Sequence, residues 1–292
     1  MRPPLQVSLN GSRGAAEGAA VPMSPEDLVE AALAAVAAGA GELLVHPRTP
    51  CGRESLSPRV VGPLLEALRG AGTSVPVVVP AGVGAEPDPA GRLERVRSWG
   101  VLPDRAAVHF GEPGAEELAG ALLDRGVAVD AVVPLGSGTG SPQTAGGEAA
   151  GVEPLARFLA WPAPDHGRVR LVAEPAAADT ALVAGLRWLP PVPVLLFGRE
   201  AAAWPVLRLA ARCGAGARIG LGDVRHLPDG RPARSNAEQV AAAVAELAAT
   251  AAPGGAATAG CPGGVGRRRR AGGAPRSLPA WGTRRRWRAG SG

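Results

Sequence analysis

The chain has 292 residues, of which 46% are hydrophobic and only 3% aromatic, enough apolar material for one large domain or two small ones. Its three cysteines have no metal-ligand spacing, which argues against a disulfide framework and predicts free thiols in a reducing compartment. The N-terminus has no apolar leader, and no uncharged apolar run reaches about 18 residues, so we expect a cytoplasmic protein without a membrane span.

The positive charge is concentrated at the C-terminus. The net charge of the whole chain is +5, but residues 252–292 carry nine arginines and no acidic residue, which leaves 22 arginines against 26 acidic residues elsewhere, a net charge of −4. This Gly-, Ala- and Arg-rich tail has too few aliphatic residues to bury a core, so we expect disorder over 251–292. Arginine runs with Trp281 and Trp287 can bind nucleic acid, but a basic run alone is a weak motif, and we expect a solvated appendage instead.

The first half of the chain alternates short strands with amphipathic helices. Residues 5–9 predict a strand, and Ser24, Pro25 and Glu26 then supply a helix cap, a proline at the first helical position and an early acid. That helix extends to about residue 38. Further strands are predicted at 42–46, 75–79 and 105–110, and further helices at 57–70, 87–98 and 114–125.

The second half repeats this alternation. Strands are predicted at 127–133, 168–174, 192–197 and 217–221, and helices at 153–160, 178–188, 201–213 and 237–250, with a Gly/Ser/Thr-rich loop at 136–151. Eight strand–helix units in about 250 residues are typical of a (β/α)8 TIM barrel, which we assign to residues 4–250. An open doubly wound sheet is the alternative, but its GxGxxG fingerprint is missing after the first strand.

The candidate functional residues lie where barrel strands end, since TIM-barrel sites lie at the carboxyl ends of the strands. Several arginines accompany histidines and carboxylates there, a mixture that suits an anionic substrate, because guanidinium groups bind carboxylates with two parallel hydrogen bonds. Many residues in such positions only cap helices or line loops. The candidates that end or follow strands are Asn10, Arg13, His46, Arg48, His109, Glu112, Glu174, Arg199, Glu200 and Asp223, and Arg218 lies near the start of the last strand.

Five segments in colinear order carry a resemblance to a known family. These segments are similar to segments of the β-keto acid cleavage enzymes. They are residues 5–11 (LQVSLNG) with 20–28 (AVPMSPEDL), 45–56 (VHPRTPCGRESL), 112–117 (EPGAEE), 218–223 (RIGLGD) and 234–238 (RSNAE). The resemblance implies a zinc-dependent TIM barrel that converts a β-keto acid and acetyl-CoA to acetoacetate and a new acyl-CoA, with zinc acting as a Lewis acid. Relatives of this kind commonly assemble, so we also expect a homo-oligomer.

The resemblance also assigns roles to residues. Arg218 and Asp223 match the family's catalytic pair, and we assign substrate binding to Asn10, Arg13 and Arg48. The family's zinc ligands are an H-x-H pair on strand two, whose two imidazoles share one face of the strand, and a Glu after strand eight.

Most of that zinc site is missing from this sequence. His46 matches the second histidine, but Leu44 stands at the first and Gly222 at the glutamate, so two of three ligands are lost where a catalytic zinc site needs about three. His109 and Glu174 could rebuild a set with His46 if they face the same mouth. The alternative is a non-catalytic or reassigned barrel that binds an anionic or CoA-like ligand. If the alignment is correct, Leu44→His with Gly222→Glu would restore zinc binding.

Overall fold

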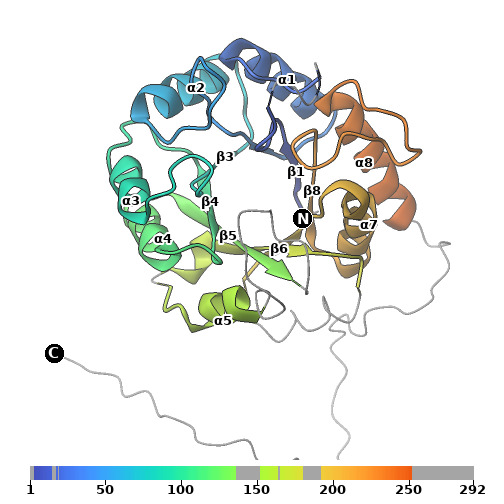
Figure 1. Cartoon of the computed structure of the whole chain (residues 1–292). Coiled ribbons are helices and arrows are strands. Elements are labelled where there is room, and N and C mark those ends of the chain that lie inside the picture. The colour runs from blue at the N-terminus through green and yellow to red at the C-terminus, as the bar shows by residue number, and fades with distance from the viewer. Residues whose placement is uncertain are drawn as a thin grey trace, which may run out of the picture. The chain divides into compact units, whose positions relative to one another are not determined.

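A computed structural model describes residues 3–14, 18, 20–135, 152–163, 165–179 and 192–251. Within these residues, eight parallel strands close into a barrel in which each strand pairs with the next and the last pairs with the first (Figure 1). The predicted (β/α)8 barrel is therefore confirmed, and the open doubly wound sheet is excluded. All described residues belong to one compact unit.

The strands are short, and most of the helices that follow them are described. The strands are β1 (Leu5–Ser8), β2 (Glu42–Leu44), β3 (Val77–Pro80), β4 (Arg105–His109), β5 (Ala128–Leu135), β6 (Val169–Pro175), β7 (Val194–Leu196) and β8 (Gly216–Ile219). The helices are α1 (Pro25–Ala37), α2 (Pro58–Gly70), α3 (Pro89–Arg97), α4 (Ala115–Asp124), α5 (Val152–Ala160), α7 (Ala203–Cys213) and α8 (Asn236–Ala251).

Local capping explains where two of the helices begin. The Ser24 hydroxyl accepts a bond from the Asp27 amide at 3.1 Å, and the Asp27 carboxylate accepts one from the Ser24 amide at 3.2 Å, so α1 opens with a complete capping box. The Ser235 hydroxyl accepts from the Glu238 amide in the same way before α8, at 3.2 Å. At α2 the side chain of Ser57 makes no cap bond, although Pro58 begins the helix as predicted.

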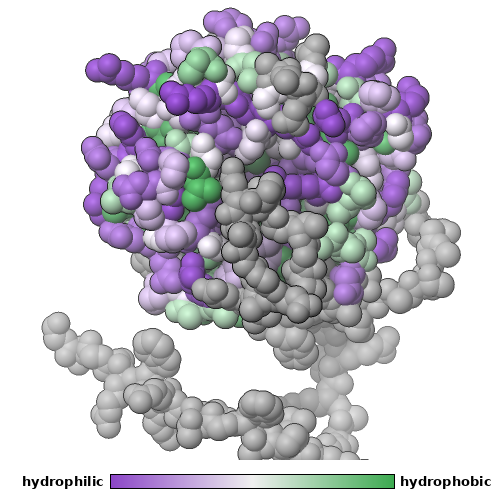
Figure 2. Space-filling model, viewed as in Figure 1, coloured by the Kyte–Doolittle hydropathy of each residue, from purple (hydrophilic) through white to green (hydrophobic). Residues whose placement is uncertain are grey.

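Several sequence predictions fall on parts of the chain that the structure does not describe. The loop at 136–151, most of the helix expected at 178–188 and the tail from residue 252 lie outside the described residues. Cys51 and Cys213 are free thiols, as predicted. Among the described residues, no helix has both the length and the apolar character needed to cross a membrane. Hydrophilic side chains cover most of the described surface in the view of Figure 2.

Alternation along the strands divides the core into two parts. Leu43 belongs to the cluster between the barrel and its helices, whereas Leu44, its neighbour, belongs to a separate cluster inside the barrel. We call this inner cluster the apolar layer. It consists of Leu44, Val78, Ala107, Val132, Val172, Leu195 and Phe197.

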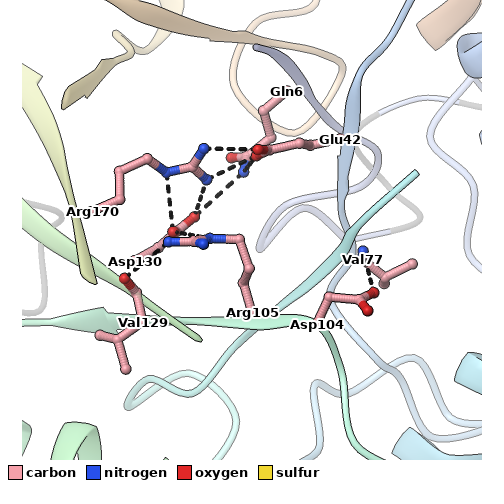
Figure 3. Close-up of polar contacts among 8 residues, drawn as sticks. All are labelled: Gln6, Glu42, Val77, Asp104, Arg105, Val129, Asp130 and Arg170. Carbon is pink, nitrogen blue, oxygen red and sulfur yellow. Dashed lines mark hydrogen bonds and ion pairs between the residues drawn. The ribbon is translucent and has the colours of Figure 1, made fainter. Parts of the chain in front are cut away.

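A charged layer fills the barrel on the amino-terminal side of the apolar layer. Arg170 on β6 donates two hydrogen bonds across the barrel to Glu42 on β2, at 2.8 and 2.9 Å, and also binds Asp130 on β5 (Figure 3). Gln6 donates to Glu42 at 3.0 Å, and Arg105 binds Asp130 at 2.6 Å. We call these five residues the ionic layer. Because these side chains meet across the barrel, the strand positions that carry them point into the barrel. The positions that point inward beyond the apolar layer lie at the opposite end, the carboxyl ends of the strands.

Candidate active site

The inward positions beyond the apolar layer form the rim of the barrel mouth. Because side chains on a strand alternate between its faces, a residue two positions beyond an inward residue also points inward. Among the residues so placed are His46, which follows Leu44, and likewise His109 and Glu174. The structure therefore brings the two histidines and the glutamate of the sequence analysis to one end of the barrel.

A buried ion pair closes one side of the mouth. Arg218 on β8 donates from Nε and Nη2 to the two carboxylate oxygens of Asp223, each at 2.9 Å, and both side chains are less than a tenth exposed. The guanidinium carbon of Arg218 stands 3.4 Å from the centre of the Phe197 ring, a cation–π contact. The Glu200 amide donates to the Asp223 carbonyl at 3.0 Å, which links the loop after β7 to the pair. The two residues matched to the family's catalytic pair thus form one rigid unit.

Two neutral imidazoles lie at the same mouth as this unit. Burial, followed by the positive charges of Arg218, Arg48 and Arg199, holds the pKa of His46 well below its usual value of 6.5. Burial and the charges of Arg199 and Arg218 lower the pKa of His109 to about 3. Both side chains are therefore uncharged at neutral pH and can serve as hydrogen-bond donors or acceptors. A pKa near 3 makes His109 a weak base, because general bases work best with a pKa near the operating pH.

The three predicted substrate-binding residues all contact the backbone of the mouth loops. Asn10 is fully buried, and its amide group exchanges two hydrogen bonds with the backbone of His46, at 2.9 and 3.0 Å. Arg48 donates to the carbonyls of Gly52 and Gly11, each at 2.7 Å. Arg13 donates to the Leu221 carbonyl at 2.7 Å and pairs with Glu200. These bonds show how the three residues hold the loops in place, and their role in substrate binding stays a prediction.

Two carboxylates at the mouth accompany arginines. Glu174 accepts a hydrogen bond from Nε of Arg199 at 2.8 Å, and the arginine side chain is 46% exposed. Glu54 lies 4.0 Å from Arg48, and burial raises its pKa against the opposing effects of a Ser12 hydrogen bond and the charges of Arg48 and Arg199. Neither Glu54 nor Phe197 is among the site residues predicted from the sequence. Phe197 could have been found, because it ends a predicted strand two residues after an inward leucine.

The residues at this mouth do not fit the zinc site that the resemblance implies. Leu44 is 3% exposed and packs in the apolar layer, so it supplies no ligand. A Cβ on Gly222 would lie 2.6 Å from the Gly11 amide nitrogen and 2.3 Å from the Ser8 hydroxyl, so the backbone leaves no room for a glutamate there. Glu174, a candidate for a rebuilt set with His46 and His109, pairs with Arg199. Over the residues that the structure describes, no three His, Cys, Asp or Glu side chains are grouped to hold a metal ion.

Sequence comparison identifies one family. The profile of the beta-keto acid cleavage enzymes matches residues 4–131 and 172–254, more than half of the chain. A search of curated proteins gives no significant match.

Comparison with solved structures shows the fold. A ternary complex of ObcA with a C4-CoA adduct and oxalate superposes with a TM-score of 0.52 at 16% identity, over 79% of this chain and 64% of that one. The binary complex of ObcA with oxaloacetate gives 0.55 at 15% identity, with the same coverage of both chains. The metallated homocysteine methyltransferase MmuM from Escherichia coli gives 0.53 at 16% identity, over 84% of this chain and 96% of that one. This chain thus spans less than two thirds of the length of ObcA.

Proposed function

Because the chain belongs to the β-keto acid cleavage enzyme family, we propose that it acts on a small β-keto acid with acetyl-CoA as its second substrate. The products are acetoacetate and a new acyl-CoA. The bond between the keto carbon and the α-carbon of the keto acid breaks, as does the thioester of acetyl-CoA. A new carbon–carbon bond and a new thioester replace them, so the reaction needs no oxidant or reductant. The ObcA complexes, which hold oxaloacetate or a CoA adduct, support a keto acid and a CoA thioester as substrates.

The observation that carries this proposal is the buried pair of Arg218 and Asp223. Asp223 binds two nitrogens of the guanidinium and fixes its plane, and among the described residues this leaves Nη1 for a ligand. A fixed guanidinium recognises a carboxylate with little further loss of side-chain freedom. The neutral imidazoles of His46 and His109 supply hydrogen bonds beside it, and Glu54, whose pKa burial raises, is a carboxylate suited to accept a proton. We assign no step to a metal ion, because the residues present do not fit one.

A second candidate function is ligand binding without turnover. It is favoured by the apolar Leu44 and the closed backbone at Gly222, which remove the family's two other zinc ligands. On this alternative the barrel binds an anionic or CoA-like ligand through the same arginines. For either function we propose a cytoplasmic location and assembly into a homo-oligomer.

Acetoacetate formation tests the proposed reaction. Purified full-length protein is incubated with acetyl-CoA and β-keto acids that bear neutral, acidic or basic side chains, and both products are quantified by liquid chromatography. We expect acetoacetate and the matching acyl-CoA in equal amounts, only when both substrates are present. Asp223→Asn should lower kcat/KM by about a hundredfold, since it releases the plane of Arg218.

The control is Arg208→Gln, which changes an arginine paired with Glu246 on α7 and α8, away from the mouth. Its kcat/KM should stay close to that of the unmodified protein. No product from any β-keto acid would reject the reaction and leave the ligand-binding alternative.

A further inference from the structure

Two arginines at the mouth share one aromatic ring. The guanidinium carbon of Arg218 lies 3.4 Å from the centre of the Phe197 ring, and that of Arg199 lies 5.9 Å from the same centre. Phe197 is fully buried and belongs to the apolar layer, so it cannot shift easily. Arg218 on β8 and Arg199 in the loop after β7 therefore lie near the same buried ring, at the mouth end of the apolar layer.

Each of these guanidinium groups is bound by a carboxylate on one edge only. Asp223 occupies Nε and Nη2 of Arg218, and Glu174 occupies Nε of Arg199. Within the described part of the chain, Nη1 of Arg218 and both terminal nitrogens of Arg199 keep their capacity to donate. These are the nitrogens with which a guanidinium binds a planar carboxylate.

The imidazoles of His46 and His109 lie at inward positions of the same mouth as the two arginines. Burial lowers the pKa of both imidazoles, and the positive charges of Arg218 and Arg199 lower it further. Nδ1 of His46 is buried and has no hydrogen-bond partner among the described residues. Buried polar atoms are nearly always paired, so this nitrogen indicates a ligand or water that completes the site.

We infer that the mouth binds the carboxylate of a small acid directly, through Arg218 and Arg199 with His46 as a hydrogen-bond partner, and that no metal ion takes part. That the acid is a β-keto acid rests on the proposed function. Direct binding replaces the zinc that the family resemblance implies, because guanidinium groups supply both the positive charge and the directed donors that a carboxylate requires.

Calorimetric titration of the full-length protein with malonate, a stable dicarboxylate, tests this inference. One set of titrations contains EDTA, and a second contains added zinc. We expect the same Kd within about twofold in both, because no metal contributes. Arg199→Gln should weaken binding by about tenfold or more, since it removes a charge-assisted hydrogen bond. Arg199 is the more exposed of the two arginines, so this variant should fold, which its Tm will verify.

Arg208→Gln is the matched control and should bind malonate as the unmodified protein does. Acetate and inorganic phosphate serve as further probes, and both should bind more weakly than malonate. The inference would be overturned if malonate binding needed zinc, or if no probe bound in EDTA. It would also be overturned if all probes bound equally and Arg199→Gln left their binding unchanged. Acetoacetate formation that needs zinc, without malonate binding in EDTA, would reject the inference and leave the proposed function. Malonate binding in EDTA without acetoacetate formation would reject the proposed function and leave the inference.

Discussion

Replacing Arg170 by methionine should lower the free energy of unfolding by about 3–5 kcal/mol, the cost of breaking a buried ion pair from one side. Arg170 is 5% exposed and binds both Glu42 and Asp130 inside the barrel. Among the described residues, its removal leaves Glu42 with the amide of Gln6, and leaves Asp130 with the partly exposed Arg105 and a longer contact to that amide, at 3.5 Å. The two carboxylates then lose most of the charge that compensates for their burial.

Urea denaturation followed by circular dichroism measures this change. Arg208→Met is the control, because it makes the same substitution at a half-exposed pair with Glu246 and should cost no more than about 1 kcal/mol. Replacing Glu42, Asp130 and Arg170 together by apolar residues of similar volume should cost less than Arg170→Met alone, since it leaves no charge unpaired. A loss below about 1 kcal/mol for Arg170→Met would show that water reaches the ionic layer.

Restoring the family's glutamate should damage the fold instead of recreating a zinc site. Gly222→Glu should destabilise the protein by about 3 kcal/mol or more, because the new side chain would meet the backbone of Gly11 and overpack the junction of two loops. Leu44→His adds a polar imidazole to the apolar layer and a further cost. The double variant is therefore expected to gain no zinc affinity, contrary to what the family alignment alone suggests.

Gly100→Glu is the matched control for this prediction. It introduces the same side chain at a glycine where an added Cβ meets nothing within 4 Å, and it should change stability by no more than about 0.5 kcal/mol. Thermal melts and zinc titrations compare the three variants. The prediction would be wrong if Gly222→Glu were as stable as Gly100→Glu and the double variant bound zinc. That result would mean that the backbone at Gly222 relaxes to admit the glutamate.

The fold was predictable because local signals agree with it. Capping residues such as Ser24 and Ser235 mark helix starts, and short β-branched runs mark the strands between them. The boundaries were less accurate. The strand predicted at 42–46 ends at Leu44, and the strand predicted at 217–221 ends at Ile219, because the chain turns toward the mouth loops there. A sequence pattern does not show where the ladder of backbone hydrogen bonds stops.

The candidate site was predictable in position but not in its pairings. The rule that barrel sites follow the strands led to His46, His109 and Glu174, the family resemblance led to Arg218, and the structure places these residues at one end. That Arg199 pairs with Glu174, and that Glu42 reaches Arg170 across the barrel, depends on the register of strands far apart in sequence. A sequence does not fix that register, so these contacts could not be derived from it. The division into a barrel at 4–250 and a tail at 251–292 stays a prediction.

Zinc content tests the central claim, that the mouth of this barrel works without the metal that its family resemblance implies. The full-length protein is saturated with zinc, freed of loosely bound metal by gel filtration and measured by elemental analysis, beside a His46→Ala variant. We predict well under one zinc ion per chain, with no difference between the two proteins. One zinc ion per chain that is lost in His46→Ala would contradict the account and show that a metal site has been rebuilt around His46.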